Sequence, residues 1–296
     1  MRKPIFTGAG VAIVTPMLED GSINYPLFAQ LLDFQLNNST DAIVVAGTTG
    51  EASILGDDEH IELFDFTVKH VNKRVPVVAG AGSNDTAYAI WLSQEAKKVG
   101  CDALLQVTPY YNKTSQLGLI RHFNAIADAT DLPIILYNVT GRTGMNIAPA
   151  TYKELIKHPN IVAAKEASGN LSHIAQVIAA CGDDLDIYSG NDDQIVPIMS
   201  LGGKGVISVL SNVMPQETHD ICALYMQGKV KESAKLQLEL LELINALFCD
   251  VNPIPVKAAV NMMGYPAGIC KLPLTEMSDA PKANLLRLMK QHGLAK

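Results

Sequence analysis

The chain has 296 residues, of which 48% are hydrophobic and 18% charged, with a formal net charge of −7 at pH 7. This composition excludes a disordered chain and suits one large globular domain, since α/β barrels routinely fill this length. The acidic balance argues against a nucleic-acid partner, because binding phosphates needs a basic face.

The N-terminal segment 1–7 carries two basic residues but no adequate apolar run and no small-residue cleavage site. We therefore expect neither a signal peptide nor a membrane span, and a cytoplasmic location. The five cysteines are scattered and include no C-x-x-C pair, so we expect free thiols instead of a disulfide framework.

Short apolar, β-branched runs recur along the chain. They occupy residues 11–15, 42–46, 76–79, 103–108, 133–137, 161–165, 186–189 and 205–210. Continuous apolarity of this kind is typical of parallel strands that are covered on both faces. The segments between them have helical spacing, as in Leu27, Leu31 and Phe34. Eight such units predict an α/β protein with a (β/α)8 TIM barrel.

An open, doubly wound sheet is the competing architecture. It is disfavoured because no G-x-G-x-x-G follows the first run and because eight regular units favour closure. Several runs end in small or polar residues, for example at Gly47, Gly80 and Ser189. In a closed barrel these ends would form the catalytic face.

After the eighth unit a long helical pattern begins at Pro215 and is rich in leucine between 236 and 247. We predict a barrel over residues 1–224 that carries the active site. A C-terminal helical region over 225–296 would pack on it. The leucine pattern does not continue over enough heptads to indicate a coiled coil. The leucines are therefore expected to pack on the barrel or on a second subunit.

Lys165 ends the apolar run 161–165 and is expected at the mouth of the barrel. A nucleophilic lysine must lose its proton, which requires desolvation or a nearby positive charge. Such a lysine could form a Schiff base. The alternative is a structural ion pair with the adjacent Glu166, and the local sequence leaves both open.

Tyr137 ends the fifth run and could act as an acid/base beside such a lysine, or be a hydrogen-bonded aromatic of the rim. Arg142 follows in a glycine-flanked loop and could bind a substrate carboxylate, or be a solvated cation. The segment Gly47-Thr-Thr-Gly-Glu51 offers backbone N–H groups, two hydroxyls and a helix start, which suit a carboxylate; the alternative is an ordinary capped turn.

The tyrosines Tyr110 and Tyr111 are, taken alone, more typical of packing residues. The seven histidines form no H-E-x-x-H or similar cluster, so no metal is predicted.

Together these motifs resemble the dihydrodipicolinate synthase family. The resemblance covers nearly the whole chain and rests on Gly47-Thr-Thr-Gly-Glu51, Tyr110-Tyr-Asn112, Tyr137-Asn-Val-Thr-Gly-Arg-Thr-Gly144, Lys165-Glu-Ala167, Ser189-Gly-Asn191 and Gly205-Val-Ile-Ser208. It implies that Lys165 forms the Schiff base, and that Thr49, Tyr137 and Tyr111 form a proton relay in which Tyr111 reaches in from a neighbouring subunit.

The resemblance also implies the binding residues. Thr48 and Thr49 would hold the carboxylate of pyruvate, Gly190 and Ile207 would line its pocket through main-chain atoms, and Arg142 would meet the carboxylate of the second substrate. The implied reaction condenses pyruvate with L-aspartate 4-semialdehyde to 4-hydroxy-tetrahydrodipicolinate, on the diaminopimelate route to lysine. No added cofactor is implied, and the assembly would be a homotetramer made of two dimers.

Some residues depart from the pattern of the family. Thr140-Gly141 precedes Arg142 where Pro-Ser or Pro-Gly is frequent, and Asn191 stands where Asp is frequent. In the cleft where lysine inhibits related enzymes, Asp57 and Tyr88 stand in place of histidine and glutamate, whereas His60 and Asn84 are kept. We therefore expect weak or absent inhibition by lysine.

Two rival functions are considered. N-acetylneuraminate lyases and keto-deoxy sugar acid aldolases share this barrel and its lysine, but they commonly carry Ser-Thr in the glycine loop and differ in the arginine loop. The pair Thr48-Thr49 together with Arg142 therefore favours the synthase. A catalytically silent barrel that only binds a keto acid or serves as an assembly scaffold is disfavoured, because four candidate site residues are all present: Lys165, Tyr137, Thr49 and Arg142.

Overall fold

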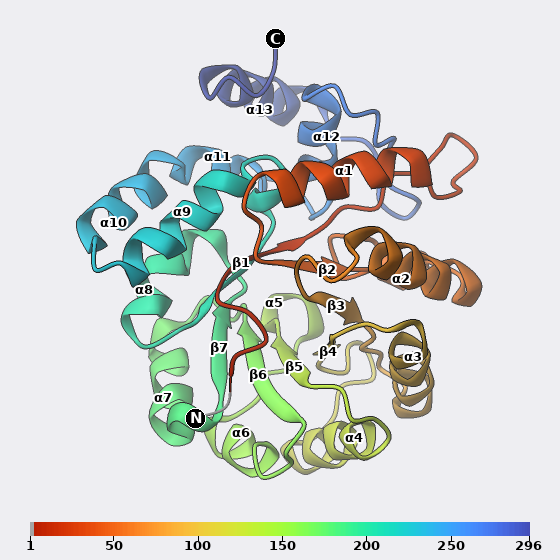
Figure 1. Ribbon diagram of the computed structural model, residues 1–296, viewed down its shortest axis with the longest axis vertical. Helices are drawn as coiled ribbons and strands as arrows, with labels where there is room; N and C mark the ends of the chain where they lie inside the picture. The colour runs from red at the N-terminus through yellow and green to blue at the C-terminus, as the bar shows by residue number, and fades with distance from the viewer. Residues whose placement is uncertain (1–2) are drawn as a thin grey trace.

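The computed structural model describes residues 3–296; the first two residues of the segment 1–7 lie outside this range. Eight parallel strands form a closed barrel in chain order, and β1 pairs with both β2 and β8 (Figure 1). The strands are β1 Gly8–Ala12, β2 Ala42–Val45, β3 Val77–Gly80, β4 Ala103–Val107, β5 Ile134–Asn138, β6 Ile161–Glu166, β7 Asp186–Ser189 and β8 Gly205–Ser208.

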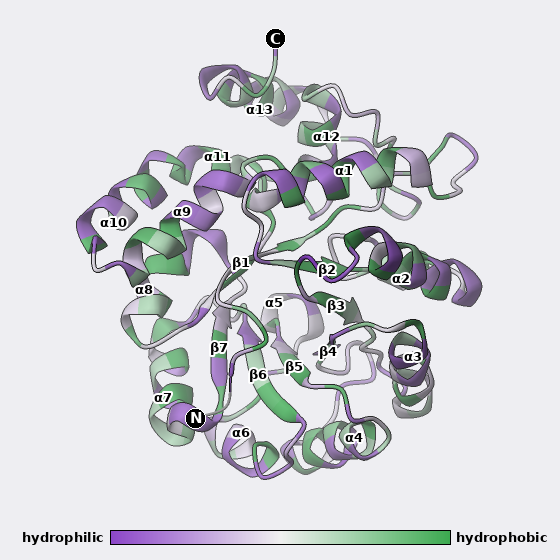
Figure 2. Cartoon of the chain, viewed as in Figure 1, coloured by the Kyte–Doolittle hydropathy of each residue, from purple (hydrophilic) through white to green (hydrophobic). Residues whose placement is uncertain are grey.

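The strands are buried on both faces, as the continuous apolar runs predicted. Figure 2 shows hydrophobic residues along β5 and β6, while the outer helices carry both polar and hydrophobic residues. Inside the barrel, small and aliphatic side chains such as Ala12, Val44 and Ile135 form one cluster. The predicted (β/α)8 barrel is confirmed.

Helices surround the barrel and cover its outer face (Figure 1). They are α1 Tyr25–Asn37, α2 Asp57–Val71, α3 Thr86–Val99, α4 Gln116–Asp128, α6 Pro149–Leu155, α7 Leu171–Cys181, α8 Ile195–Ser200 and α9 Pro215–Met226. The short helix α5 Thr140–Thr143 lies inside this ring of helices, directly after β5 (Figure 1). Short 3-10 turns are η1 Ala52–Ile54, η2 Gly182–Asp184, η3 Asp192–Gln194 and η4 Leu210–Asn212. Polar caps begin several helices: the side chain of Asn170, for example, accepts a hydrogen bond from the backbone N–H of His173 at the start of α7.

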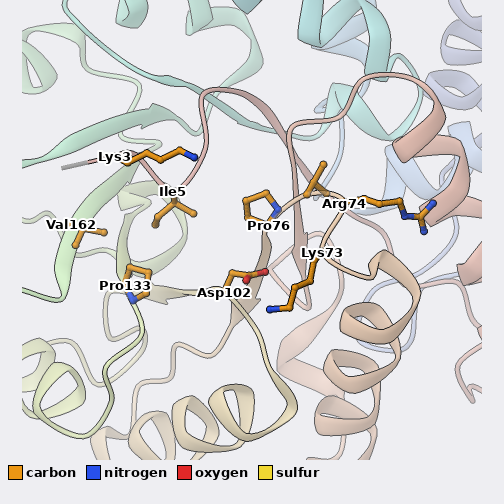
Figure 3. A pocket seen from close by; sticks show the side chains of 9 residues that line it. Lys3, Ile5, Lys73, Arg74, Pro76, Asp102, Pro133 and Val162 are labelled. Atoms are coloured by element: carbon orange, nitrogen blue, oxygen red, sulfur yellow. The ribbon is translucent and has the colours of Figure 1, made fainter. Parts of the chain in front are cut away.

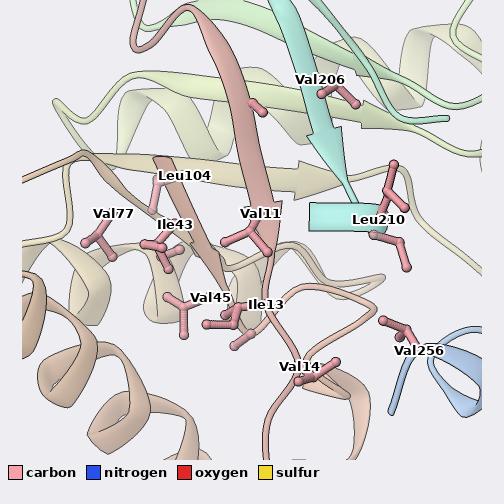
Figure 4. Packing of buried hydrophobic residues seen from close by; sticks show 14 of the residues in the cluster. Val11, Ile13, Val14, Ile43, Val45, Val77, Leu104, Val206, Leu210 and Val256 are labelled. Atoms are coloured by element: carbon pink, nitrogen blue, oxygen red, sulfur yellow. The ribbon is translucent and has the colours of Figure 1, made fainter. Parts of the chain in front are cut away.

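A large apolar cluster joins the outer face of the strands to the helices. Figure 4 shows Val11, Ile43 and Val77 within it, together with Val256 from the C-terminal part of the chain. Burial of such side chains is the main stabilising contribution to the fold. The same cluster therefore holds the barrel and the C-terminal helices together.

The C-terminal appendage consists of α10 Val230–Glu239, α11 Leu241–Ala246, α12 Ile254–Met262 and α13 Asp279–Gln291. The long leucine-rich pattern is thus divided at Leu240 into two helices. Figure 1 shows α10 beside α9, and α13 packs on α11 and α12. The boundary between residues 224 and 225 remains a prediction; it falls within α9.

Within residues 3–296, no helix has both the length and the apolar character needed to cross a lipid bilayer.

Candidate active site

Lys165 and Tyr137 lie side by side at the carboxyl ends of β6 and β5. They are register partners in the parallel pairing of these strands, so their side chains leave the sheet on the same face. The Nζ atom of Lys165 is 4.3 Å from the centroid of the Tyr137 ring. Each residue is only 6% exposed. The sequence placed both residues at the mouth of the barrel, and the structure brings them into contact there.

Glu166 occupies the opposite face of β6, because side chains alternate along a strand. Its carboxylate accepts hydrogen bonds from the hydroxyl of Tyr152 at 2.6 Å, from Asn138 Nδ2 and from Ser168 Oγ. Burial raises the pKa of the Glu166 carboxyl, and these three donors oppose that rise. The carboxylate is therefore occupied by neutral donors outside the lumen instead of serving as an ion-pair partner for Lys165.

A cavity of about 540 Å³ opens at this end of the barrel. Its walls include Thr48, Tyr137 and Arg142, which the sequence singled out. It also extends to His60 and Tyr88 beyond the end of β3. Three of the predicted binding and catalytic residues thus share one cavity.

A buried ion pair connects the glycine loop after β2 to the C-terminal region. Glu51 adopts a left-handed backbone conformation with φ of 60°, and its Oε1 lies 2.7 Å from Lys257 Nζ of α12. Both side chains are 2% exposed or less. The loop continues into the short turn η1 before α2 begins at Asp57, so the expected helix start is a single 3-10 turn.

Thr49 and Arg142 are connected through one residue of the C-terminal region. Asn252 donates from its side-chain Nδ2 to Thr49 Oγ1 at 3.0 Å. Its backbone carbonyl accepts a hydrogen bond from Arg142 Nη2 at 3.1 Å. Asn252 was missed in the sequence, because the only signal is a polar residue between two helices.

Gly190 and Ile207 lie at the ends of β7 and β8. The Gly190 N–H donates to the backbone carbonyl of Glu166 at 2.7 Å. A Cβ atom on Gly190 would lie 2.6 Å from the Cβ of Ala167, so only glycine allows the two chains to approach this closely. Ile207 is fully buried and belongs to the same lumen cluster as Tyr137.

Asp192 is a buried carboxylate that follows Gly190. Its Oδ2 accepts hydrogen bonds from the backbone N–H groups of Val209 and Leu210, which connects the end of β7 to the end of β8. Burial raises the pKa of Asp192, whereas hydrogen bonds and the positive charge of Lys165 oppose the rise. This residue was also missed in the sequence.

Tyr111 is not part of the site within one chain. Its side chain is 93% exposed, and its backbone has a φ of 66°, which is uncommon for a residue other than glycine. The neighbouring Tyr110 does line the cavity. Among the predicted residues, Thr48, Tyr137 and Arg142 thus line the cavity and Lys165 lies over Tyr137, whereas Tyr111 lies on the surface of the chain.

A second cavity of about 570 Å³ lies at the amino ends of the strands, with Lys3, Lys73 and Arg74 on its rim (Figure 3). It contains none of the predicted site residues, and the active sites of TIM barrels occupy the opposite end. Across residues 3–296 there is no group of three or more His, Cys, Asp or Glu side chains that could hold a metal ion.

Comparison with known proteins decides the family. The model of the dihydrodipicolinate synthetase family matches residues 5–292. The chain belongs to this family. A family member from Lachnoclostridium phytofermentans, a 4-hydroxy-tetrahydrodipicolinate synthase, is 57% identical over 291 residues, which covers 98% of this chain and 99% of that protein.

Solved structures of family members agree with the barrel. The enzyme from Cyanidioschyzon merolae with lysine bound superposes with a TM-score of 0.96 at 41% identity and covers 99% of this chain and 100% of its own. The chloride-inhibited enzyme from Acinetobacter baumannii complexed with pyruvate has a TM-score of 0.95 at 41% identity, covering 97% and 99%. The family resemblance noted in the sequence is confirmed.

Proposed function

We propose that this protein is a 4-hydroxy-tetrahydrodipicolinate synthase, a carbon–oxygen lyase that condenses pyruvate with L-aspartate 4-semialdehyde. The observation that carries the proposal is the buried amine of Lys165 over the ring of Tyr137, a tyrosine that lines the cavity together with Arg142. A buried lysine beside a phenol suits imine chemistry, in which both a nucleophile and a proton carrier are needed.

Lys165 starts the reaction by adding its amine to the ketone carbon of pyruvate. Loss of water then leaves a protonated imine, which draws electrons from the methyl carbon and makes its proton acidic. Removal of that proton gives an enamine. The reacting carbon needs no added cofactor, because the imine itself is the electron sink.

The enamine carbon next forms a bond to the aldehyde carbon of the second substrate. The amino group of that substrate attacks the imine carbon and displaces the amine of Lys165, which closes the ring and restores the enzyme. Arg142 would hold the carboxylate of the second substrate through paired N–H donors. Thr48 and Thr49 would hold the carboxylate of pyruvate, with Gly190 and Ile207 forming the wall of the pocket through main-chain atoms.

Tyr137, Thr49 and Tyr111 would carry protons between the imine, the new hydroxyl and solvent. The high exposure of Tyr111 on the isolated chain supports a role in the site of a neighbouring subunit. A dimer would then be the minimum active unit, and we propose a homotetramer of two dimers.

All five cysteines are free thiols, four of them buried. Free thiols are typical of reducing compartments, which supports a place in the cytoplasm.

The function is tested by product formation from pyruvate and L-aspartate 4-semialdehyde, run beside cleavage of N-acetylneuraminate. Turnover in the first assay alone is expected. Turnover in the second alone would keep the role of Lys165 but reassign the substrate to the sugar-acid lyases. Borohydride with pyruvate should add the mass of a reduced adduct to the wild-type chain and not to Lys165→Ala.

A further inference from the structure

Asn252 is the one residue described above that contacts both Thr49 and Arg142. It lies between α11 and α12, separated from Thr49 by 203 positions and from Arg142 by 110. Its side chain is 6% exposed, so water does not compete for these contacts. The C-terminal helical region thus places an amide directly against the predicted proton relay.

The hydrogen bond to Thr49 constrains a hydroxyl that would otherwise rotate. A threonine hydroxyl has one proton to donate and two lone pairs that accept. Because Asn252 Nδ2 donates to Thr49 Oγ1, one lone pair is occupied and the Thr49 proton must point to another acceptor. A relay needs this direction, since each hydroxyl must accept from one neighbour and donate to the next.

The other end of the Asn252 amide argues against a purely structural role. Its Oδ1 atom is buried and has no hydrogen-bond partner among the described residues. A buried acceptor without a partner is unfavourable for folding. Hydrogen bonding within the protein therefore does not by itself explain why an amide is buried here. A role for its N–H group as a donor to Thr49 does explain it.

We propose that Asn252 is a positioning residue for the condensation, which acts through Thr49 by fixing the direction of its hydroxyl. The proposal rests on the proposed function, because it assigns Thr49 to the proton relay. The contact of Arg142 with the Asn252 carbonyl holds the same segment against the cavity. Asn252 itself touches no reacting atom in this scheme.

Replacement of the amide by a carboxylate tests the direction of the hydrogen bond. Ionised aspartate has nearly the same shape but can only accept, so in Asn252→Asp the hydroxyl of Thr49 would turn toward residue 252. The measurement is exchange of the pyruvate methyl protons with deuterated solvent, followed by NMR on the full-length enzyme. This exchange reports the relay without the second substrate.

At about pH 8 we expect exchange to fall about 10-fold to 100-fold in Asn252→Asp, while borohydride trapping of pyruvate on Lys165 persists. As the pH is lowered, exchange relative to wild type should recover, because a protonated carboxyl can donate to Thr49 again. Wild-type exchange at pH 8 would overturn the proposal, since it would show that Thr49 needs no donor there.

Asn261→Asp is the matched control. Asn261 also donates from its side-chain amide, to the Gly268 carbonyl at 2.8 Å, but it is exposed on α12. This variant should exchange and trap pyruvate like the wild type.

A double-mutant cycle covers the case in which the aspartate variant does not fold. Asn252→Ala should slow exchange in the wild-type background but add no further loss in Thr49→Val, because its effect passes through that hydroxyl. Fully additive losses would overturn the proposal. Absence of trapping in the wild type would instead refute the proposed function, so the two failures are distinguishable.

Discussion

The amine of Lys165 lies over the face of the Tyr137 ring, at 4.3 Å from its centroid, on the neighbouring strand of the same barrel. The face of an aromatic ring attracts an amine or ammonium group, so the ring helps to hold the Lys165 side chain in this position. Because both side chains leave rigid strands at the same register, their separation is set by the sheet and not by a loop. The ring positions the amine of Lys165, whereas the hydroxyl is available for proton transfer. A substitution at residue 137 can therefore test the two roles separately.

Tyr137→Phe keeps the ring beneath Lys165 and removes only the hydroxyl. We expect turnover to fall about 10²-fold to 10⁴-fold, the usual contribution of a general acid/base. Borohydride trapping of pyruvate should remain detectable, though weak. Steady-state kinetics and mass spectrometry on the same preparation check both results. Wild-type turnover would remove Tyr137 from the mechanism.

Lys257→Met should destabilise the protein, because it leaves Glu51 buried without its partner. Loss of one member of a buried pair costs about 3–5 kcal/mol. Urea unfolding of the wild type and the variant measures this loss as a difference in the free energy of unfolding. Lys97→Met is the control, because its ion pair with Asp131 is exposed to solvent and should contribute little to the free energy of unfolding. Equal losses in the two variants would contradict the role of the buried pair.

Lysine is expected to inhibit weakly or not at all. The Tyr88 hydroxyl donates to Asp57 Oδ1 at 2.8 Å, beside His60 and at the edge of the active-site cavity. Burial raises the pKa of Tyr88 to about 12, so this position remains a neutral phenol where lysine-inhibited relatives carry glutamate. Steady-state assays with added lysine check the prediction, which a micromolar inhibition constant would refute. Tyr88→Glu should increase any inhibition that is present.

His219 should make stability depend on pH. Its Nδ1 lies 2.8 Å from Asp41 Oδ2, and this hydrogen bond raises the pKa of His219 in spite of partial burial. A raised folded-state pKa stabilises the protein fully below the unfolded value of about 6.5, and the stabilisation is lost as the pH rises through the folded pKa. The difference in Tm between wild type and His219→Gln should therefore shrink from pH 5.5 to pH 8.5.

The same comparison of Tm values, with and without His219→Gln, is repeated in the Asp41→Asn background. Without this carboxylate the pKa of His219 loses its main cause of elevation and only Asp220 still raises it, so the pH-dependent difference in Tm should become smaller. A Tm difference between wild type and His219→Gln that grows with pH would contradict the assignment of sign.

The barrel could be predicted because each strand is a short apolar run covered on both faces. The prediction was least accurate for the first strand, which was expected at residues 11–15, whereas β1 is Gly8–Ala12. Gly8 and Gly10 have no β-branched character, so the sequence gives no local sign of a strand there. Pairing of Gly8 with Gly205 of β8 sets the true beginning of the strand, and that contact is not local.

The site was predictable only where its residues end strands. Lys165 and Tyr137 follow apolar runs, so their meeting at one edge follows from the parallel topology. Asn252 and Lys257 instead approach the glycine loop from a region more than 200 positions away. The spacing of apolar residues along a helix predicts which face is buried, but it does not predict which distant loop that face contacts. Asn252 and Lys257 could therefore be recognised only in the folded chain.

The supports of the glycine loop have a consequence for how the protein is made. Thr49 and Glu51 leave the ribosome 203 and 206 residues ahead of Asn252 and Lys257, their side-chain partners. At synthesis rates of 5–20 residues per second, this delay is roughly 10–40 s. Until then the loop lacks both the amide and the cation that hold it. A nascent chain can therefore assemble its strands well before its catalytic face is complete.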